Sequence, residues 1–124
     1  MYFIAFEPTL TLLSCLCVST VGSYGCSNDP YFSFSQLPLL DRGVVYAIAH
    51  IRGGGEMGRA LWYEEGGKYF TKMNTFHDFA ACGLYLQQQG VTSKQQMAIV
   101  GRSAGGLLIG RCVCLSPLNG LISF

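Results

Sequence analysis

The most constraining feature of this sequence is a serine set among glycines between two apolar runs. Gly101-Arg102-Ser103-Ala104-Gly105 is a G-x-S-x-G pentapeptide, and Gly106 follows it. Residues 97–100 before it are predicted to form a short buried strand, and residues 107–109 after it open a helix. A serine at a sharp strand-to-helix turn needs small neighbours, because the two backbones pass closely there. The glycines on both sides of Ser103 meet that need.

This arrangement predicts a nucleophile elbow. Such a turn presents the Ser103 hydroxyl above the sheet at a helix N-terminus, and the backbone N–H of Ala104 faces the oxyanion of a tetrahedral intermediate. The reaction class that follows is acyl transfer through a serine ester. A phosphate-binding loop is the competing use of such glycines, but its G-x-x-x-x-G-K-[ST] pattern is absent.

The rest of the pattern predicts an α/β fold. Residues 44–49 form a continuous β-branched and aromatic run, which is typical of a strand buried on both faces. Thr75 and Asp78 have capping-box spacing, and Gly90 ends the helix that they open, over about residues 75–89. The predicted core face of that helix is Phe76, Phe79, Ala80, Gly83 and Leu84. Strand, helix, strand, helix in this order predicts a parallel sheet with flanking helices.

A second glycine cluster, residues 52–58, follows the first predicted strand. One interpretation is a loop on the active-site side, because open α/β sheets bind ligands at the carboxyl ends of their strands. The other is a structural turn in which Arg52 and Glu56 pair with other groups.

Charged residues make up only 12 % of the 124 residues, hydrophobic residues make up 50 %, and the net charge is +1. Since charged residues are about a quarter of a typical soluble domain, this chain is expected to lie against a partner or within a larger protein. The basic residues are scattered between Arg42 and Arg111, so neither nucleic acid nor an anionic membrane is an expected partner.

The six cysteines are expected to be free thiols, because the chain is too rich in apolar runs for a disulfide framework. Their C-x-C spacing does not match a zinc site, so no metal and no cofactor is expected. The apolar run at residues 10–21 is shorter than the ~18 residues of a membrane-spanning helix. It also lacks the preceding basic residues of a signal peptide, so we expect a cytoplasmic protein. The run is either a buried strand or lies outside the fold.

Taken together, several segments resemble the prolyl oligopeptidase family of serine peptidases, and its oligopeptidase B branch most closely. They are Gly22-Ser23-Tyr24-Gly25, Asp29-Pro30-Tyr31-Phe32-Ser33, Leu40-Asp41-Arg42-Gly43, Ala49-His50-Ile51-Arg52-Gly53-Gly54-Gly55-Glu56, Trp62-Tyr63-Glu64, residues 72–76 with Asp78-Phe79, and residues 101–106. The resemblance implies an incomplete α/β-hydrolase fold over residues 22–110, flanked by a divergent N-terminal segment (residues 1–21) and a divergent tail (residues 111–124). It also implies hydrolysis of short peptides, after Lys or Arg in the oligopeptidase B branch.

The resemblance further implies roles for single residues. Ser103 falls on the nucleophile, and Ala104 on the residue whose amide forms half of the oxyanion hole. A tyrosine hydroxyl completes that hole in the family, and the corresponding residue here is Val21. Asp29 falls on an acidic position that is linked to binding of basic substrates, whereas the second acidic position is Tyr31. Leu61 is one residue too many between the glycine cluster and Trp62.

The serine nucleophile also needs a base and an acid, which follow it in the order Ser, Asp, His in α/β-hydrolases. Residues 104–124 contain no Asp, Glu or His, and His50 and His77 precede the serine. We therefore expect this chain to be an inactive fragment that holds only the nucleophile segment. The alternatives are a non-catalytic interaction module and a different α/β-hydrolase such as an esterase.

Overall fold

The sheet of this protein has four strands in the order β1-β3-β2-β4. It is seen in a computed structural model that describes residues 2–6, 16–20 and 22–114. Strands β2 (Leu16–Thr20), β3 (Val45–His50) and β4 (Met97–Gly101) are parallel to one another, as predicted, and β1 (Tyr2–Phe6) is antiparallel to β3.

The strand β2 lies between the two strands that the sequence predicted. It pairs with β3 from Leu16↔Val45 onward and with β4 from Leu16↔Met97 onward. For the apolar run at residues 10–21, the interpretation as a strand is therefore confirmed over residues 16–20. The antiparallel pairing of β1 with β3 was not predicted. It leaves β4 as the outer strand on the opposite side of the described sheet.

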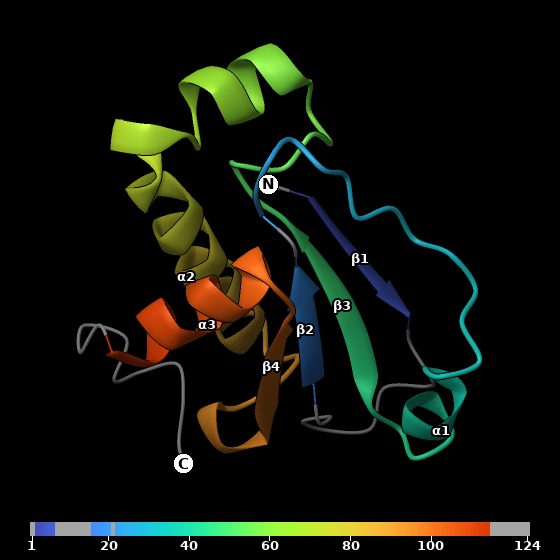
Figure 1. The fold of residues 1–124 in the computed structure, drawn as a ribbon. Coiled ribbons are helices and arrows are strands. Elements are labelled where there is room, and N and C mark those ends of the chain that lie inside the picture. Colours follow the sequence, from blue (N-terminus) through green and yellow to red (C-terminus); the bar gives the residue numbers. More distant parts are fainter. Residues whose placement is uncertain (1, 7–15, 21, 115–124) are drawn as a thin grey trace.

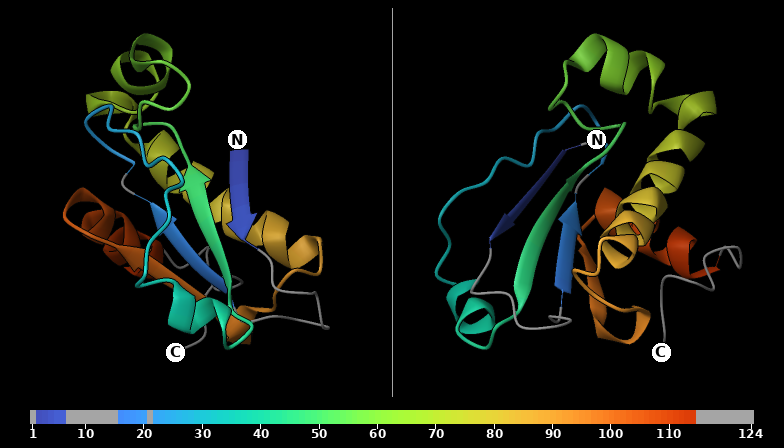
Figure 2. Two further views of the ribbon diagram at one scale, coloured as in Figure 1. Left: turned by 90° about the vertical axis from the view of Figure 1, so that its right-hand side faces the viewer. Right: turned by 180° about the vertical axis from the view of Figure 1, so that it is seen from behind.

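Two helices cover one face of this sheet (Figures 1 and 2). They are α2 (Met73–Gln88) and α3 (Ala104–Cys114). Alternate residues of β3 and its extension point into the core that these helices close. The core consists of Val45, Ala47, Ala49 and Ile51 from the strand and Phe76, Phe79, Cys82, Leu86, Leu108 and Cys112 from the helices. The opposite face of β3 is also buried at Ile48 and His50, which confirms the prediction for this strand.

The same prediction is wrong for β4. Its burial alternates, and Val100 is half exposed. The reason is that β4 is the outer strand of the described sheet, and α3 covers only one of its faces.

Two predictions about α2 are corrected. The helix begins two residues before Thr75, and Asp78 does not cap it, because its carboxylate binds Arg52 instead. Leu84 is 41 % exposed rather than part of the core face. The other predicted core residues of this helix, Phe76, Phe79, Ala80 and Gly83, are buried as expected.

The remaining helical segments are short: α1 (Leu37–Leu40), η1 (Ala60–Glu65), η2 (Tyr69–Thr71) and η3 (Lys94–Gln96). The segment η1 is a π-helix, which is wider by one residue per turn than an α-helix. It contains Leu61, the residue that the resemblance predicts to be one too many. A π-turn is a form in which a helix accommodates an inserted residue, so the form of η1 agrees with that prediction.

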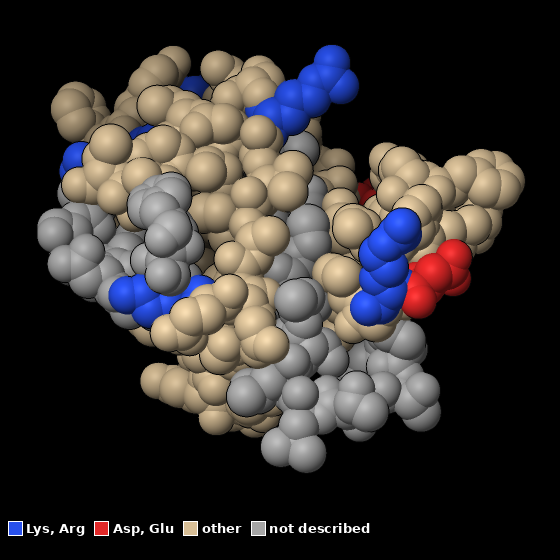
Figure 3. Space-filling view, turned by 90° about the horizontal axis from the view of Figure 1, so that it is seen from below, with Lys and Arg blue, Asp and Glu red and all other residues tan. Residues whose placement is uncertain are grey.

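Helix α3 continues through Cys114, with Cys112 in the core, so the described part of the predicted tail is helical. Charged side chains are few on the face seen from below (Figure 3). Among the described residues, no helix is both long and apolar enough to cross a membrane.

Candidate active site

Ser103 lies in the turn between β4 and α3, as predicted. Its φ is +56°, a left-handed conformation that a residue with a side chain adopts at a cost of about 1 kcal/mol or more. Ser103 is also exposed to solvent. The strained, exposed serine between strand and helix is the geometry that defines a nucleophile elbow.

Close packing within the turn explains one of its glycines, Gly101. A Cβ atom on Gly101 would overlap the carbonyl group of Gly105 and press on the Ile109 side chain. The turn itself is closed by two backbone bonds of 2.9 Å, from the Gly105 N–H to the Arg102 carbonyl and from the Gly106 N–H to the Ser103 carbonyl. Gly101 is therefore required by the fold of the turn.

Ala104 is the first residue of α3. The first N–H groups of a helix have no partner within the helix, and the helix dipole places a partial positive charge beside them. The backbone N–H of Ala104, next to the Ser103 hydroxyl, is thus suited to stabilise a negatively charged oxygen.

A pocket of about 210 Å³ adjoins this helix start. Its walls come from the loop after β2, from the segment around η1 and η2, and from the first turn of α3. The lining residues are Ser23, Tyr24, Tyr63, Gly67, Lys68, Tyr69, Lys72, Ala104 and Leu107. Ser103 immediately precedes a lining residue, so the elbow stands at the edge of the pocket.

Backbone strain is concentrated around this pocket. In the described part of the chain, three residues other than glycine have a positive φ: Tyr24 (60°), Tyr69 (46°) and Ser103 (56°). Two of them line the pocket and the third is the candidate nucleophile. Strained backbone persists only where its surroundings enforce it, and it clusters at functional sites.

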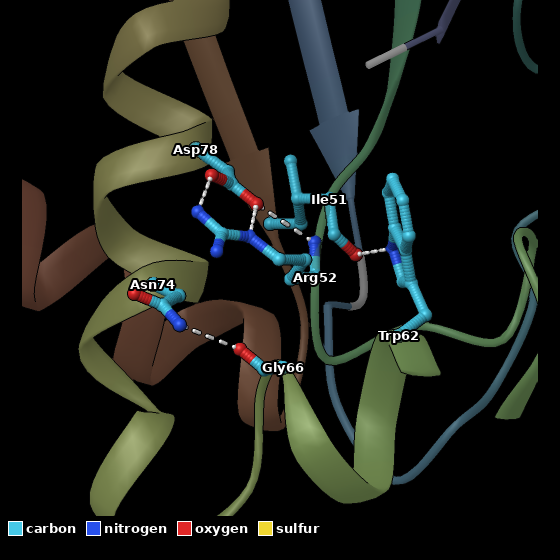
Figure 4. Close-up of polar contacts among 6 residues, drawn as sticks. All are labelled: Ile51, Arg52, Trp62, Gly66, Asn74 and Asp78. Atoms are coloured by element: carbon cyan, nitrogen blue, oxygen red, sulfur yellow. Dashed lines mark hydrogen bonds and ion pairs between the residues drawn. The ribbon is translucent and has the colours of Figure 1, made fainter. Parts of the chain in front are cut away.

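The second glycine cluster acts as the structural frame of the pocket. Arg52 binds Asp78 with two side-chain hydrogen bonds, of 2.7 Å and 2.6 Å, and its backbone N–H donates to the same carboxylate (Figure 4). This pairing raises the pKa of the Arg52 guanidinium. The indole N–H of Trp62 donates to the Ile51 carbonyl at 2.5 Å, and the Asn74 amide donates to the Gly66 carbonyl at 3.0 Å (Figure 4).

The cluster also holds the loop that carries Tyr24. The Gly25 N–H donates to the Gly53 carbonyl at 3.0 Å, and a Cβ atom on Gly53 would overlap the Gly22 carbonyl oxygen. Glu56 accepts a hydrogen bond from the Asn28 N–H at 2.9 Å. Of the two interpretations of this cluster, the structural turn in which Arg52 and Glu56 have partners is therefore confirmed.

Two lysines give the pocket its charge, and they differ in their partners. The Lys68 ammonium lies 2.6 Å from the Glu64 carboxylate, which raises the pKa of Lys68 and lowers that of Glu64. The Lys72 ammonium donates to the Gly22 carbonyl at 2.8 Å and to the Ser23 hydroxyl. Burial lowers the pKa of Lys72.

The other predicted site residues lie elsewhere. Asp29 is exposed in the loop after β2 and does not line the pocket, and Val21 falls outside the described residues. His50 is buried, and its Nε2 lies 2.9 Å from the Asn28 carbonyl oxygen, whereas His77 is exposed on α2. Neither histidine lines the pocket beside Ala104. In the part of the chain that the structure describes, no three His, Cys, Asp or Glu residues are grouped to hold a metal ion.

Sequence reasoning missed Lys68, Tyr69 and Lys72 as pocket residues. The only sequence signal for these residues is that they stand close to the family motifs before α2. That signal does not indicate where their side chains lie in the folded structure. The positive φ of Tyr24 and Tyr69 has no signature in residue type, since both are ordinary tyrosines.

Comparisons with known proteins define the family to which this fold belongs. The sequence profile of the prolyl oligopeptidase family matches residues 30–117. A dipeptidyl aminopeptidase BI from Pseudoxanthomonas mexicana is 55 % identical over 96 residues, and protease 2 from Moraxella lacunata is 53 % identical over 89. These matches cover 77 % and 72 % of this chain, and 13 % of each relative.

The structure agrees with the sequence comparison. Oligopeptidase B from Trypanosoma brucei, solved with covalently bound antipain, superposes with a TM-score of 0.88 at 45 % identity. Oligopeptidase B from Leishmania major superposes with a TM-score of 0.78 at 53 % identity. The matches cover 94 % and 81 % of this chain, and 17 % and 14 % of those chains.

The chain therefore belongs to the prolyl oligopeptidase family, a family of serine peptidases, and its fold is part of an α/β-hydrolase domain. Among the branches of that family it is similar to oligopeptidase B, as the sequence motifs had indicated. The chain spans only 13–17 % of the relatives named above.

Proposed function

We propose that this chain is the nucleophile segment of a serine oligopeptidase, in which Ser103 attacks the peptide carbonyl and forms an acyl-enzyme. The Ala104 N–H stabilises the oxyanion of the tetrahedral intermediate, and the leaving group is the amine of the cleaved peptide. The observation that carries this proposal is the strained conformation of Ser103 directly before the N-terminus of α3. A structural serine gains nothing from that strain, whereas an exposed nucleophile requires the sharp turn.

A general base and its orienting acid are also required, and residues 104–124 contain no Asp, Glu or His. We therefore propose that the 124 residues do not turn over substrate by themselves. The second candidate function is an interaction module without catalysis. The exposed apolar side chains, such as Phe34 and Phe70, favour it for the isolated chain.

A chimera tests the role of Ser103 directly. Residues 22–114 replace the matching segment of Trypanosoma brucei oligopeptidase B, so the host supplies the base, the acid and the residue at position 21. We expect hydrolysis of an Arg-ending fluorogenic peptide, and a loss of roughly 10⁶-fold in kcat with Ser103→Ala. Ser35→Ala, which removes another exposed serine, is the matched control and retains activity. An inactive, folded chimera would contradict the proposal.

A chimera that is longer by one residue tests whether Val21 leaves the oxyanion hole incomplete. A second chimera carries residues 21–114 and so brings Val21 into the host. Removal of one oxyanion-hole donor costs about 10²–10³ in kcat, so the second chimera should be slower than the first by that factor. Equal rates would show that the residue at position 21 does not contribute.

Asp29 is the proposed contact for a basic substrate residue, on the grounds of its position in the family motif and its exposure. In the first chimera, Asp29→Asn should raise the KM for the Arg-ending peptide and leave the KM of a neutral peptide unchanged. Asp41→Asn, an exposed carboxylate after α1, is the control. We also propose a reducing compartment such as the cytoplasm, because Cys26, Cys82, Cys112 and Cys114 are free thiols.

A further inference from the structure

We propose that the pocket beside Ala104 is a carboxylate-binding subsite whose anchor is the ammonium group of Lys72. This assignment concerns binding alone. It does not depend on the proposed function, because it requires no reaction at Ser103.

The charge of Lys72 is the first observation. The residue is part-buried, and the acceptors of its ammonium group are a carbonyl oxygen and a hydroxyl, both neutral. Among the described residues, no carboxylate lies within ion-pair distance of it. Burying a charge without an opposite charge is costly, and the lowered pKa of Lys72 has burial as its cause. An anion in the pocket would offset that cost.

Geometry supplies the donor. An ammonium group has three N–H donors, and the Gly22 carbonyl and the Ser23 hydroxyl occupy two of them. The third donor has no hydrogen-bond acceptor among the described residues, and the nearest printed neighbour of the ammonium group is the ring of Phe76, whose centroid lies 6.0 Å away. Ala104, the first residue of α3, lines the same pocket, and the dipole of this eleven-residue helix adds positive potential there.

Lys68 is not the anchor, because Glu64 already neutralises it. Its ammonium group lies 2.6 Å from the Glu64 carboxylate and over the rings of Tyr63 and Tyr69, at 5.2 Å and 5.0 Å from their centroids. Tyr63, Lys68 and Tyr69 together form one wall of the pocket. Lys72 is left as the lysine of the pocket whose charge has no counterion among the described residues.

The strained backbone supports a binding role for the pocket. Tyr24 and Tyr69 both adopt a positive φ, and both side chains line the pocket while largely exposed. The volume of about 210 Å³ is below the roughly 300 Å³ of the smallest sites for drug-sized ligands. The occupant is therefore a single carboxylate-bearing group of a peptide, either its C-terminus or an acidic side chain.

Calorimetric titration of the full chain tests this assignment. The probes are acetyl-phenylalanine, which has a free terminal carboxylate, its neutral amide, and acetyl-glutamic acid α-amide, which has a side-chain carboxylate. We expect at least one of the two acids to bind about tenfold or more tightly than the neutral amide. The tighter of the two acids identifies the source of the carboxylate. Equal affinity of all three probes would overturn the proposal.

Matched variants locate the site. Lys72→Gln should remove the preference for the acid. Lys94→Gln removes an equal charge close to the start of β4, at the end of the strand away from Ser103, and should leave the preference unchanged. The preference for the acid is measured without any reaction at Ser103, so this test and the chimera test can fail separately. A preference for the acid that survives in Lys72→Gln would place the anion elsewhere.

Competitive acetylation of the unaltered chain covers the case in which Lys72→Gln does not fold. Acetic anhydride modifies free amines, and mass spectrometry gives the extent at each lysine. The preferred acid should slow modification of Lys72 several-fold relative to Lys94, and the neutral amide should not. Unchanged modification of Lys72 at saturating acid would overturn the assignment.

Discussion

Two glycines of the elbow show how the turn depends on single residues. Gly101 faces the Gly105 carbonyl group and has no room for a Cβ atom, whereas a Cβ atom on Gly106 would meet only the Gly101 carbonyl oxygen at 3.7 Å. Both are glycines of one motif, but only the first is required by close packing.

Alanine at these two positions should therefore have opposite effects. Gly101→Ala should lower the free energy of unfolding by about 1–3 kcal/mol, as overpacking does. Gly106→Ala should raise it by about 0.5 kcal/mol, because alanine favours a helix more than glycine does. Urea denaturation of both variants measures the difference. Similar effects for the two would show that the turn is not closely packed at Gly101.

Two buried thiols give the chain a defined response to alkaline pH. Burial raises the pKa of Cys82 to about 12 and that of Cys112 to about 11, from an ordinary value of 9.0. Between pH 9 and these values the folded state keeps protons that the unfolded chain releases. Stability is therefore complete below pH 9 and falls as the pH rises through this window.

Cys82→Ala should reduce the steepness of that fall. The loss for each buried thiol is up to about 1.4 kcal/mol per pH unit, so the variant should lose stability more slowly between pH 9 and pH 11. Cys114→Ala removes an exposed thiol and serves as the control. The measurement is the free energy of unfolding in urea at several pH values, and equal slopes for both variants would contradict the account.

At the scale of elements, the π-helix η1 is the clearest response of the structure to its sequence. An additional residue within a helical turn is accommodated by widening that turn, and Leu61 is largely exposed within it. The wide turn lets Trp62 keep its hydrogen bond to Ile51 while Tyr63 lines the pocket.

Deletion of Leu61 should convert η1 into an α-helical turn. We expect the variant to fold, with a melting temperature equal to or above that of the unaltered chain, because hydrogen bonding in a π-turn is less favourable. Leu61→Ala keeps the turn and should change stability by less than about 0.5 kcal/mol, as for an exposed position. An unfolded deletion variant would show that the wide turn is required.

The elements that the sequence predicted best are those with strong local patterns. The strand β3 and the helix α2 follow from their apolar periodicity, and the elbow follows from glycine spacing. The pairing partner of Asp78 could not be read locally, because capping and an ion pair with Arg52 require the same carboxylate and only the packed structure decides between them. The pocket could not be predicted either, since its walls come from three segments far apart in the chain.

For the whole molecule, uncovered apolar surface is the dominant feature. Helices α2 and α3 lie on one side of the described sheet, and Val100 on the outer strand β4 is half exposed. Large side chains are exposed elsewhere, including Phe34 at 79 % and Phe70 at 103 %. Such surface favours association, and so does the edge of β4 that has no partner strand among the described residues.

The isolated chain should therefore self-associate as its concentration rises. Light scattering of the 124 residues alone over a series of concentrations should show oligomers at the higher ones. A monomer at every concentration would show that the exposed apolar surface does not drive association.

Peptide hydrolysis by the isolated chain tests the central claim most directly, namely that it supplies the nucleophile but not a complete triad. The rate of cleavage of an Arg-ending fluorogenic peptide is compared between the unaltered chain and Ser103→Ala. The account predicts the same trace rate for both, because a serine without a base is not activated. Robust cleavage by the unaltered chain that Ser103→Ala abolishes would contradict it.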